Sequence, residues 1–394
     1  MFYNQGMDTL PSLELLSSEM YLEPDGDVPC LAGSREPQKQ KQRHSLSISQ
    51  AIMPNGRPIR LLKTLLTSVC ERNCYYCPFQ AGRDFRRATF KPEEMALAFM
   101  ALHRAGTAEG IFLSSGVVNG GVNTQEKLIE TAEILRCRLE YQGYLHLKIM
   151  PGAEYGQVER AMLLADRVSI NLEAPNSERL HKLAPRKTFL QELLDPLIWM
   201  GQIRHRNPGS HAWKGYWPSS VSQFVVGGAG ESDAELVKTS EFLYKQVGVK
   251  RTYYSAFTPM PETPLENQPA GSLRRELRLY QASFLLRDYN FHYEDMPFDK
   301  DGNLPLNQDP KQAWAEKNLL EQPAEINLAG REELLRIPGI GPKSARAILA
   351  ARQQGKRIRL QDLEGLHKLG VNSRRAAPYI LVDGKRPARQ LGLW

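Results

Sequence analysis

Cys70, Cys74 and Cys77 stand in the segment TSVCERNCYYCPF, and their types and spacing could do chemistry. The spacing C-x3-C-x2-C lets one loop wrap three thiolates around one metal centre. Thiolates are soft ligands that favour zinc or iron–sulfur clusters. A structural zinc site needs four ligands, and the nearest histidine candidate, His103, lies inside a helical pattern. Three thiolates on a 4Fe–4S cluster leave one iron open to a small molecule, and a zinc site completed from afar is the alternative.

A second segment with binding chemistry is LRIPGIGPKSARA, at residues 335–347, which resembles a helix–hairpin–helix motif. Its glycines permit a tight turn with the backbone close to a ligand, and Pro342 suits the first position of a helix. Such a helix points its N–H groups and dipole at an anion, here a nucleic-acid phosphate. A structural or protein-binding hairpin is the alternative. A degenerate second half of the motif contributes Arg374 and Arg375. The predicted nucleic-acid contacts are Pro338, Gly339, Ile340, Gly341, Lys343, Arg346, Arg374 and Arg375.

The charge of the chain is concentrated at the same end. The sequence has 51 Lys and Arg against 44 Asp and Glu, a formal net charge of +7. Residues 331–394 hold 14 basic and 5 acidic residues, which leaves 37 and 39 in the rest of the chain. Because the positive excess is not scattered, it indicates an anionic partner, most often nucleic acid, at the C-terminal end.

The elements that must position these residues alternate between short apolar strands and amphipathic helices. We expect strands at Ile59–Leu66, Gly110–Ser114, Tyr144–Met150, Arg167–Leu172, Val221–Val226 and Arg251–Phe257. We expect helices at Pro92–Ala105, Gln125–Tyr141, Tyr155–Ala165, Thr188–Gln202, Asp233–Gln246 and Ser272–Tyr289. This alternation is typical of βαβ units on a parallel sheet. It predicts an α/β fold, a partial (β/α)6 barrel whose chemistry lies on the loops after the strands.

Length and composition set the domain plan. With 394 residues, 41% hydrophobic and 24% charged, the chain is typical of a folded soluble protein of two to three domains. No apolar stretch approaches the roughly 18 residues of a membrane helix, and no signal peptide is recognised. We therefore expect a cytoplasmic protein without disulfides and without a membrane partner. The predicted parts are a 1–50 N-terminal arm, a 51–298 partial barrel, a 299–325 linker, a 326–384 all-α helix–hairpin–helix domain and a 385–394 basic tail.

The cysteine spacing, its place after the first strand, and the aromatic pair Tyr75 and Tyr76 resemble the radical S-adenosylmethionine (SAM) superfamily. The resemblance covers about Ile59 to Tyr289 and implies a 4Fe–4S cluster on the three cysteines, with SAM chelated to the open iron. It further implies an electron donor such as flavodoxin or ferredoxin, whose electron cleaves SAM to a 5′-deoxyadenosyl radical. In such enzymes the cofactor carries the chemistry, while the protein supplies placement and water exclusion.

The same resemblance implies contacts with SAM. The turn Ser114-Ser115-Gly116 stands where the family has a Gly-Gly-Glu turn that receives the SAM amino group, so the carboxylate is missing here. Asn171 and Glu173 stand where family members face the SAM ribose. Phe79 is placed to contact adenine, and Gly227 closes the fifth strand, where backbone meets methionine or adenine. The alternative for the turn and for Phe79 is a purely structural role.

Two cysteines remain, too few for an auxiliary cluster. Cys137 falls on the apolar stripe of a predicted helix, together with Ala132 and Leu135, so we expect it to be buried. Cys30 lies in the loop-like arm, which could fold over the active site. Because a loop cysteine has no packing role of its own, Cys30 is our candidate for a catalytic residue that donates a hydrogen atom to the substrate.

The combination of the two motifs resembles radical SAM proteins described as acting in DNA modification or repair, over nearly the whole chain. It implies a base or sugar of DNA as substrate, which must be flipped out or unpaired to enter a barrel. Two alternatives stay open. One is an RNA- or tRNA-modifying radical SAM enzyme, and the other is a non-catalytic nucleic-acid-binding protein whose cluster is structural or redox-sensing.

Overall fold

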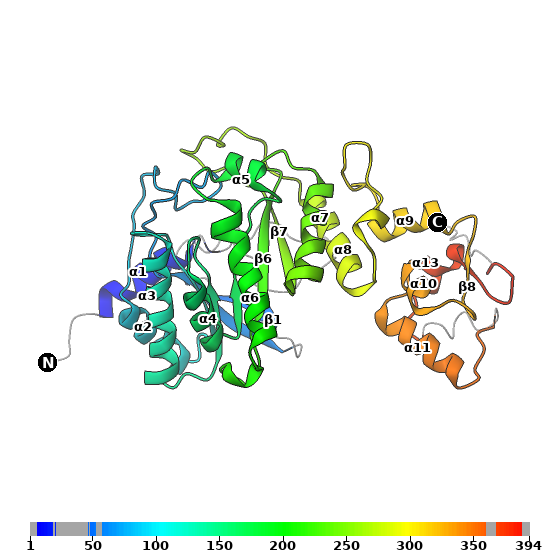
Figure 1. The fold of residues 1–394 in the computed structure, drawn as a ribbon, viewed down its shortest axis with the longest axis horizontal. Coiled ribbons are helices and arrows are strands. Elements are labelled where there is room, and N and C mark those ends of the chain that lie inside the picture. The colour runs from blue at the N-terminus through cyan, green and yellow to red at the C-terminus, as the bar shows by residue number, and fades with distance from the viewer. Residues whose placement is uncertain are drawn as a thin grey trace. The chain divides into compact units, whose positions relative to one another are not determined.

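The computed structural model describes residues 6–18, 20, 46, 48–52, 57–359 and 368–387. These residues form two compact units, drawn in Figure 1. The first unit extends to Glu231 and includes Phe242–Glu276, and the second comprises Ser232–Glu241 and the chain from Leu277 onward. No helix in this part of the chain is both long enough and apolar enough to cross a membrane.

The first unit is built on one seven-stranded sheet whose strands lie in chain order. They are β1 (Ile48–Ile52), β2 (Pro58–Leu65), β3 (Gly110–Ser114), β4 (Tyr144–Lys148), β5 (Arg167–Ser169), β6 (Ser219–Val226) and β7 (Arg251–Ala256). β1 pairs with β2 antiparallel, whereas all later neighbours are parallel. β2 to β7 are thus the six strands of the predicted partial barrel, and the predicted α/β class is confirmed.

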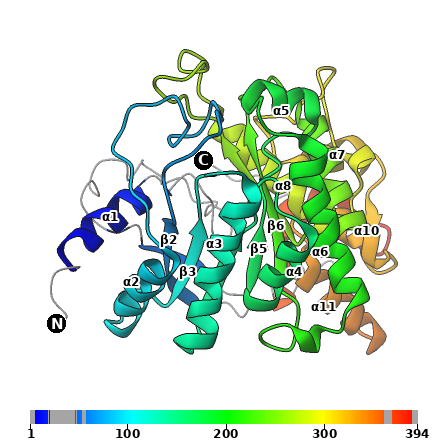
Figure 2. The ribbon, with the colours of Figure 1, turned by 60° about the vertical axis from the view of Figure 1, so that its left-hand side comes forward.

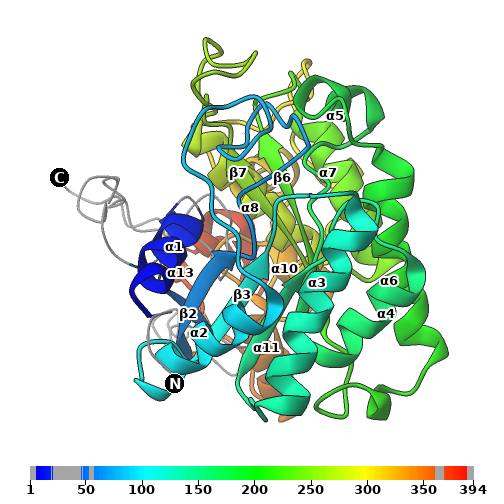
Figure 3. The ribbon, with the colours of Figure 1, turned by 90° about the vertical axis from the view of Figure 1, so that its left-hand side faces the viewer.

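Burial explains why these strands take parallel partners. β3 and β4 are buried at every position, and a strand covered on both faces has a continuous apolar run rather than alternation. Figures 2 and 3 show the curved sheet with α2, α3, α4 and α6 on its outer side. The inner side of the curve is left to the loops and side chains that form the site described below.

The helices of the first unit lie between the strands, and all of them except the one at Ser177–Leu183, which was not expected, lie near the expected positions. They are α2 (Pro92–Arg104), α3 (Gly121–Glu133), α4 (Tyr155–Leu164), α5 (Ser177–Leu183) and α6 (Asp195–Arg206), and α8 (Leu273–Asp288) begins after β7. α2 starts with Pro92 in its first turn, and the amide of Lys91 donates to Glu94 Oε2 at 2.9 Å. Proline in the first turn and the Glu94 carboxylate that accepts from the Lys91 amide fix where the helix begins.

The N-terminal region contains more structure than an arm. Helix α1 (Gly6–Ser18) buries Leu13 and Leu16 and lies beside β2 (Figure 3). Met20, which follows it, is also buried. The expected arm therefore contributes α1 and the antiparallel edge strand β1 to the first unit.

A π-helical turn overturns the expectation for Cys137. The predicted helix passes at Ile134–Arg138 into the π-helix η2, in which the extra residue rotates the side chains that follow. Arg136 is consequently 2% exposed and Cys137 lies on the surface. The regular helical period had placed Cys137 on the buried stripe, which is wrong.

The second unit is mainly helical, with α7 (Asp233–Phe242), α9 (Pro310–Asn318), α10 (Arg331–Arg336), α11 (Pro342–Gln353) and α13 (Ser373–Ala376). The short strands β8 (Ala324–Glu325) and β9 (Ile380–Leu381) pair parallel, an addition to the expected helices. The segment 299–325, expected as a linker, contains α9. Ala315 and Leu319 of that segment belong to one core with Leu334 and Ile348, so α9 is part of the folded unit.

Candidate functional site

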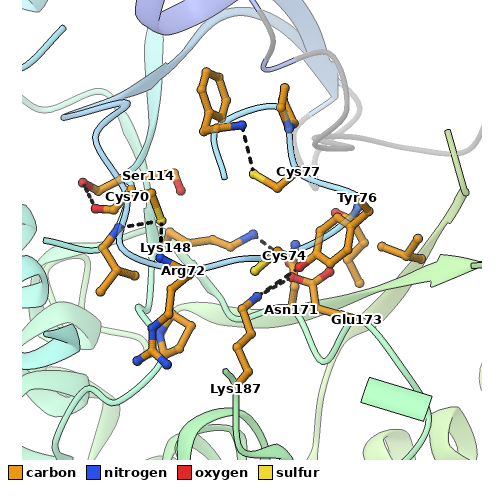
Figure 4. Close-up of a pocket in the computed structure, with 18 of the residues that line it drawn as sticks. Cys70, Arg72, Cys74, Tyr76, Cys77, Ser114, Lys148, Asn171, Glu173 and Lys187 are labelled. Carbon is orange, nitrogen blue, oxygen red and sulfur yellow. Dashed lines mark hydrogen bonds and ion pairs between the residues drawn. The ribbon is translucent and has the colours of Figure 1, made fainter. Parts of the chain in front are cut away.

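A pocket lies at the carboxyl ends of the parallel strands, where loops from several βα units meet (Figure 4). The chemistry-bearing residues that line it are Cys70, Arg72, Cys74, Tyr76, Cys77, Ser114, Ser115, Lys148, Asn171, Glu173, Lys187, Gln223, Ser255 and Thr258. Its apolar wall includes Met20, Leu65, Ile149, Ile170 and Phe257. An apolar cavity with a few convergent polar groups is the usual form of a cofactor or substrate site.

The cysteine loop follows β2 and holds its sulfurs against backbone amides. Cys74 is buried, and Cys70 and Cys77 are half-buried. The amides of Arg72 and Val117 each donate to Cys70 Sγ at 3.4 Å, and the amide of Phe79 donates to Cys77 Sγ at 3.4 Å. Amide donors aimed at sulfur stabilise the thiolate form that metal ligation needs.

Gly116 lets the turn after β3 approach this loop. A Cβ at Gly116 would lie 2.1 Å from the Val69 carbonyl oxygen and 3.1 Å from Cys70 Cβ. The Gly116 amide donates to the Thr67 carbonyl at 2.7 Å. The turn Ser114-Ser115-Gly116 therefore packs directly against the chain that carries the first cysteine, and only glycine fits there.

A buried ion pair stands beside Cys74. Lys187 Nζ lies 3.1 Å from Glu173 Oε1 and 3.0 Å from the Tyr76 hydroxyl (Figure 4). The side chains of Lys187 and Glu173 are only 9% and 6% exposed. Glu173 has a left-handed backbone with φ of 65°, and it joins β6 through an isolated bridge to Phe224. Glu173 lies four residues beyond the end of β5, and its carboxylate is among the groups that line the pocket.

The pKa values of these groups follow from burial and charge. Burial raises the pKa of the Cys74 and Cys77 thiols and raises that of Tyr76 well above its usual value. Burial alone would lower the pKa of Lys187, but the negative charge of Cys74, when that sulfur is ionised, and that of the Glu173 carboxylate raise it. The lysine is therefore cationic, whereas the thiols need a further positive centre to ionise.

Deeper in the half-barrel, polar side chains of neighbouring strands bind one another. Lys148 Nζ donates to Asn171 Oδ1 at 2.7 Å. His146 Nε2 lies 2.8 Å from Ser169 Oγ, and its ring is 4.3 Å from that of Phe112. Burial lowers the pKa of His146 well below its usual value, so this imidazole is neutral at physiological pH.

The second unit brings the two halves of the glycine-rich motif together. The Asn372 amide donates to the Gly339 carbonyl at 2.9 Å, and Ser344 Oγ donates to the Gly370 carbonyl at 2.7 Å. Gly339 has φ of +86°, and a Cβ there would lie 2.4 Å from Asn372 O. The hairpin thus requires glycine at this position.

The predicted nucleic-acid contacts of this hairpin divide into two sets. Lys343, Arg346, Arg374 and Arg375 are exposed. Pro338 and Ile340 are buried, so that they can offer only backbone to a ligand. α11 begins at Pro342 with Gly341 as its N-cap, and the amides of its first turn have no acceptor within the helix. The geometry presents amides and cations as an anion site requires.

Comparison with known families identifies the part of the chain that carries the three cysteines. The model of the radical SAM superfamily matches residues 64–243, and that of the helix-hairpin-helix motif matches residues 324–351. Residues 64–243 are a radical SAM domain. Members of this superfamily bind a 4Fe–4S cluster and SAM, which are therefore the cofactors of the domain. Among curated proteins the chain has no match.

Several solved structures resemble part of the chain. The FeFe-hydrogenase maturase HydG from Carboxydothermus hydrogenoformans is 16% identical, with a TM-score of 0.44 over 57% of this chain and 51% of its own. Methylornithine synthase (PylB) is 14% identical, with a TM-score of 0.45 over 57% and 61%. Coproporphyrinogen III oxidase (HemN) from Escherichia coli is 12% identical, with a TM-score of 0.36 over 57% and 51%. The chain spans about half to three fifths of their lengths.

The residues of the radical SAM domain fit its cofactors in two respects. The donor set is three sulfurs with amide support, as an iron–sulfur cluster needs. Glu173 Oε2 is buried without a hydrogen-bond partner among the described residues, and a ribose hydroxyl is a donor that would satisfy it. No three His, Cys, Asp or Glu side chains in the described ranges are grouped around the place of a single metal ion. A cluster takes each thiolate on a different iron, so its ligands do not converge on one point.

Most residues predicted for the cofactors of the radical SAM domain lie in the one pocket: the three cysteines, Phe79, Ser114, Ser115, Gly116, Asn171 and Glu173. Gly227 is not among its lining residues; its amide donates to Glu231 Oε1 at 2.6 Å, and its carbonyl accepts from Gln268. Cys30 lies outside the described residues. Its role as a hydrogen donor stays a prediction.

Sequence reasoning missed Lys148 and Lys187 in the pocket of the radical SAM domain. Lys148 is the last residue of β4, and its place at a strand end was a signal that could have found it. Lys187 lies in the loop between α5 and η3 (Phe189–Leu194), far from any strand end. Only the packing of that loop over the pocket places it beside Glu173.

Proposed function

We propose that this protein is a radical SAM enzyme that modifies or repairs DNA at a base or sugar. The observation that carries the proposal is the presence of a radical SAM domain and a helix-hairpin-helix motif in one chain. The positive excess of residues 331–394 supports an anionic macromolecular substrate. An unactivated C–H bond of a nucleotide is a target that suits radical chemistry.

Three residues would hold the cluster and others would orient SAM. The chemistry that cluster and SAM supply when bound is one-electron cleavage of SAM, yielding a 5′-deoxyadenosyl radical that abstracts hydrogen from substrate. Cys70, Cys74 and Cys77 would hold the cluster, and a flavodoxin or ferredoxin would deliver the electron. The backbone of Ser114-Ser115-Gly116 would receive the amino group of SAM.

The polar groups of the pocket orient the ribose. Glu173 Oε2 is available to accept from a hydroxyl, while Oε1 is held by Lys187. Asn171 Oδ1 accepts from Lys148 Nζ, which holds the Asn171 side chain in the pocket wall near Glu173. Phe79, buried on the pocket wall, would contact the adenine. Lys187 thereby fixes a carboxylate that would otherwise be free to rotate.

The apolar wall excludes water from the reacting atoms. Leu65, Ile149, Ile170 and Phe257 are each at most 5% exposed, and they line the pocket together with Met20 of the N-terminal segment. A carbon radical survives long enough to reach its target only when side reactions are kept out. The same wall requires that a DNA base enter unstacked, either flipped out or already single-stranded.

An anaerobic assay tests the proposal. Protein reconstituted with iron and sulfide is incubated with SAM, a reductant and either DNA or RNA, and 5′-deoxyadenosine is measured. We expect iron rather than zinc in the protein, formation of 5′-deoxyadenosine, and a nucleoside of altered mass in digested DNA.

Three results would contradict it. Zinc in place of iron would show that the three cysteines do not hold an iron–sulfur cluster. Absence of 5′-deoxyadenosine would favour a nucleic-acid-binding protein whose cluster is structural or redox-sensing. An altered nucleoside in RNA alone would transfer the activity to RNA. Competition between DNA and RNA for the protein, measured at rising salt, shows which polymer it prefers. Salt weakens the phosphate contacts that both polymers make, so the difference in affinity that remains reflects the preference.

A further inference from the structure

A buried lysine lies behind the hairpin of the second unit. Lys311, in the first turn of α9, is 8% exposed. Its Nζ donates to the Ile340 carbonyl at 2.6 Å and lies 4.5 Å from the centre of the Tyr289 ring. Lysine is almost never buried to this extent unless it is paired. The position of this one, on the glycine-rich turn itself, calls for a physical reason.

Two backbone carbonyls of the hairpin accept hydrogen bonds from other parts of the second unit. The Gly339 carbonyl accepts from the Asn372 amide, and the Ile340 carbonyl accepts from Lys311. The Ile340 amide donates to the Ile337 carbonyl and the Gly341 carbonyl accepts from the Ala345 amide, whereas the first amides of α11 have no acceptor within the helix. The donors bonded to these two carbonyls partly offset their partial negative charges, which would otherwise repel an anion bound by the amides.

We propose that Lys311 is a positioning residue of a phosphate site at the start of α11, where its ammonium holds the Ile340 carbonyl and adds positive charge behind the amides that bind a nucleic-acid phosphate. This inference rests on the proposed nucleic-acid function. Because protein rather than water surrounds the ammonium, its field is screened less than that of the exposed Lys343. A cation in this place explains why a costly buried lysine is kept beneath the turn.

The groups around Lys311 make its charge depend on pH. Burial lowers the pKa of Lys311 to about 7, with the Asp309 carboxylate raising it and Arg375 lowering it further. Tyr289, whose own pKa is raised by burial and by Asp288, faces the ammonium with its ring and stays neutral. Lys311 is therefore charged below neutrality and loses its charge as the pH rises. A bound phosphate favours the charged form, so binding above neutral pH takes up a proton and weakens as pH increases.

A pH series with two matched variants tests the role of Lys311. The affinity of the full chain for a short labelled DNA duplex is measured by fluorescence anisotropy from pH 6 to 9 at constant salt. Lys311→Met removes the buried charge, and Lys317→Met removes an exposed charge from the same helix. We expect Lys311→Met to weaken binding about three- to tenfold at pH 6 and hardly at all at pH 9. Wild type and Lys317→Met should lose affinity together as the pH rises, whereas Lys311→Met should not.

The outcomes separate this inference from the function on which it rests. If Lys311 only stabilised the fold, Lys311→Met would change the affinity for DNA by the same factor at every pH. That result, or no change in affinity at all, overturns the inference. Wild-type protein that binds neither DNA nor RNA overturns the proposed function instead. If Lys311→Met does not fold, as judged by thermal unfolding, Lys311→Gln is used in the same series. Calorimetry of the wild type in buffers of different ionisation enthalpy must also show proton uptake at pH 8.

Discussion

Glu173 has one carboxylate oxygen held by Lys187 and the other buried without a partner among the described residues. Leaving such an acceptor unsatisfied is costly, so a ligand hydroxyl at this point gains the full value of a charge-assisted hydrogen bond.

We therefore expect Glu173→Gln to weaken SAM binding about tenfold to a hundredfold. The measurement is equilibrium dialysis of SAM against the anaerobic, reconstituted protein, with iron content checked in parallel. Glu178→Gln, an exposed glutamate on α5, is the matched control and should bind SAM like the wild type. An unchanged affinity in Glu173→Gln, with a full iron content, would place the ribose elsewhere.

At the level of single residues, the sequence allowed prediction where a motif or a strand end fixes the position. Cys70, Cys74 and Cys77 lie in one loop, and Glu173 follows a strand, so both could be placed in advance. Lys187 belongs to neither class. It reaches the pocket because its loop folds over Tyr76, and no local pattern encodes that contact.

The turn after β3 shows how one element positions another. Gly116 packs so closely on the cysteine loop that a Cβ would meet the Val69 carbonyl oxygen at 2.1 Å. If residue 116 carried a Cβ, the backbone of the turn or that of the cysteine loop would have to move. We expect the cysteine loop to move, because Cys70 lies farther from the end of its strand than Gly116 does from the end of β3.

Gly116→Ala should consequently lower the free energy of unfolding by about 1–3 kcal/mol and reduce the iron bound after reconstitution to about half or less. Urea unfolding of the metal-free protein and iron analysis are the two measurements. Gly82→Ala is the control, because Gly82 lies just beyond the cysteines and a Cβ there meets nothing within 4 Å. Equal iron content in the two variants would show that the turn does not support the loop.

The pattern of elements was predictable to the extent that periodicity is local. β3, buried throughout, was found with its observed ends. β5 was expected to reach Leu172 but ends at Ser169, and the chain pairs with β6 again only at Glu173, through an isolated bridge to Phe224. α9 was missed because only three of its nine residues, Trp314, Ala313 and Ala315, are apolar apart from its proline. Its packing partners come from distant helices, which a window along the sequence does not see.

At the scale of the whole molecule, the chain carries two compact units with separate cores and separate sets of polar groups. The radical SAM domain holds the thiolates, and the glycine-rich hairpin of the second unit holds the amides and exposed cations. We expect SAM cleavage measured without nucleic acid to depend on the first set alone. We expect nucleic-acid affinity measured without SAM to depend on the second set.

Variants of the two sets should therefore separate the two activities. Cys74→Ala removes a cluster ligand, so it should abolish 5′-deoxyadenosine formation and leave DNA affinity unchanged. Gly339→Val combined with Gly341→Val should lower DNA affinity at least about tenfold and leave SAM cleavage in the absence of DNA intact. The reason is that Gly339 has φ of +86° and a Cβ there would meet the Asn372 carbonyl at 2.4 Å, which pulls the paired hairpins apart. Loss of both activities in either variant would mean that the units do not act independently.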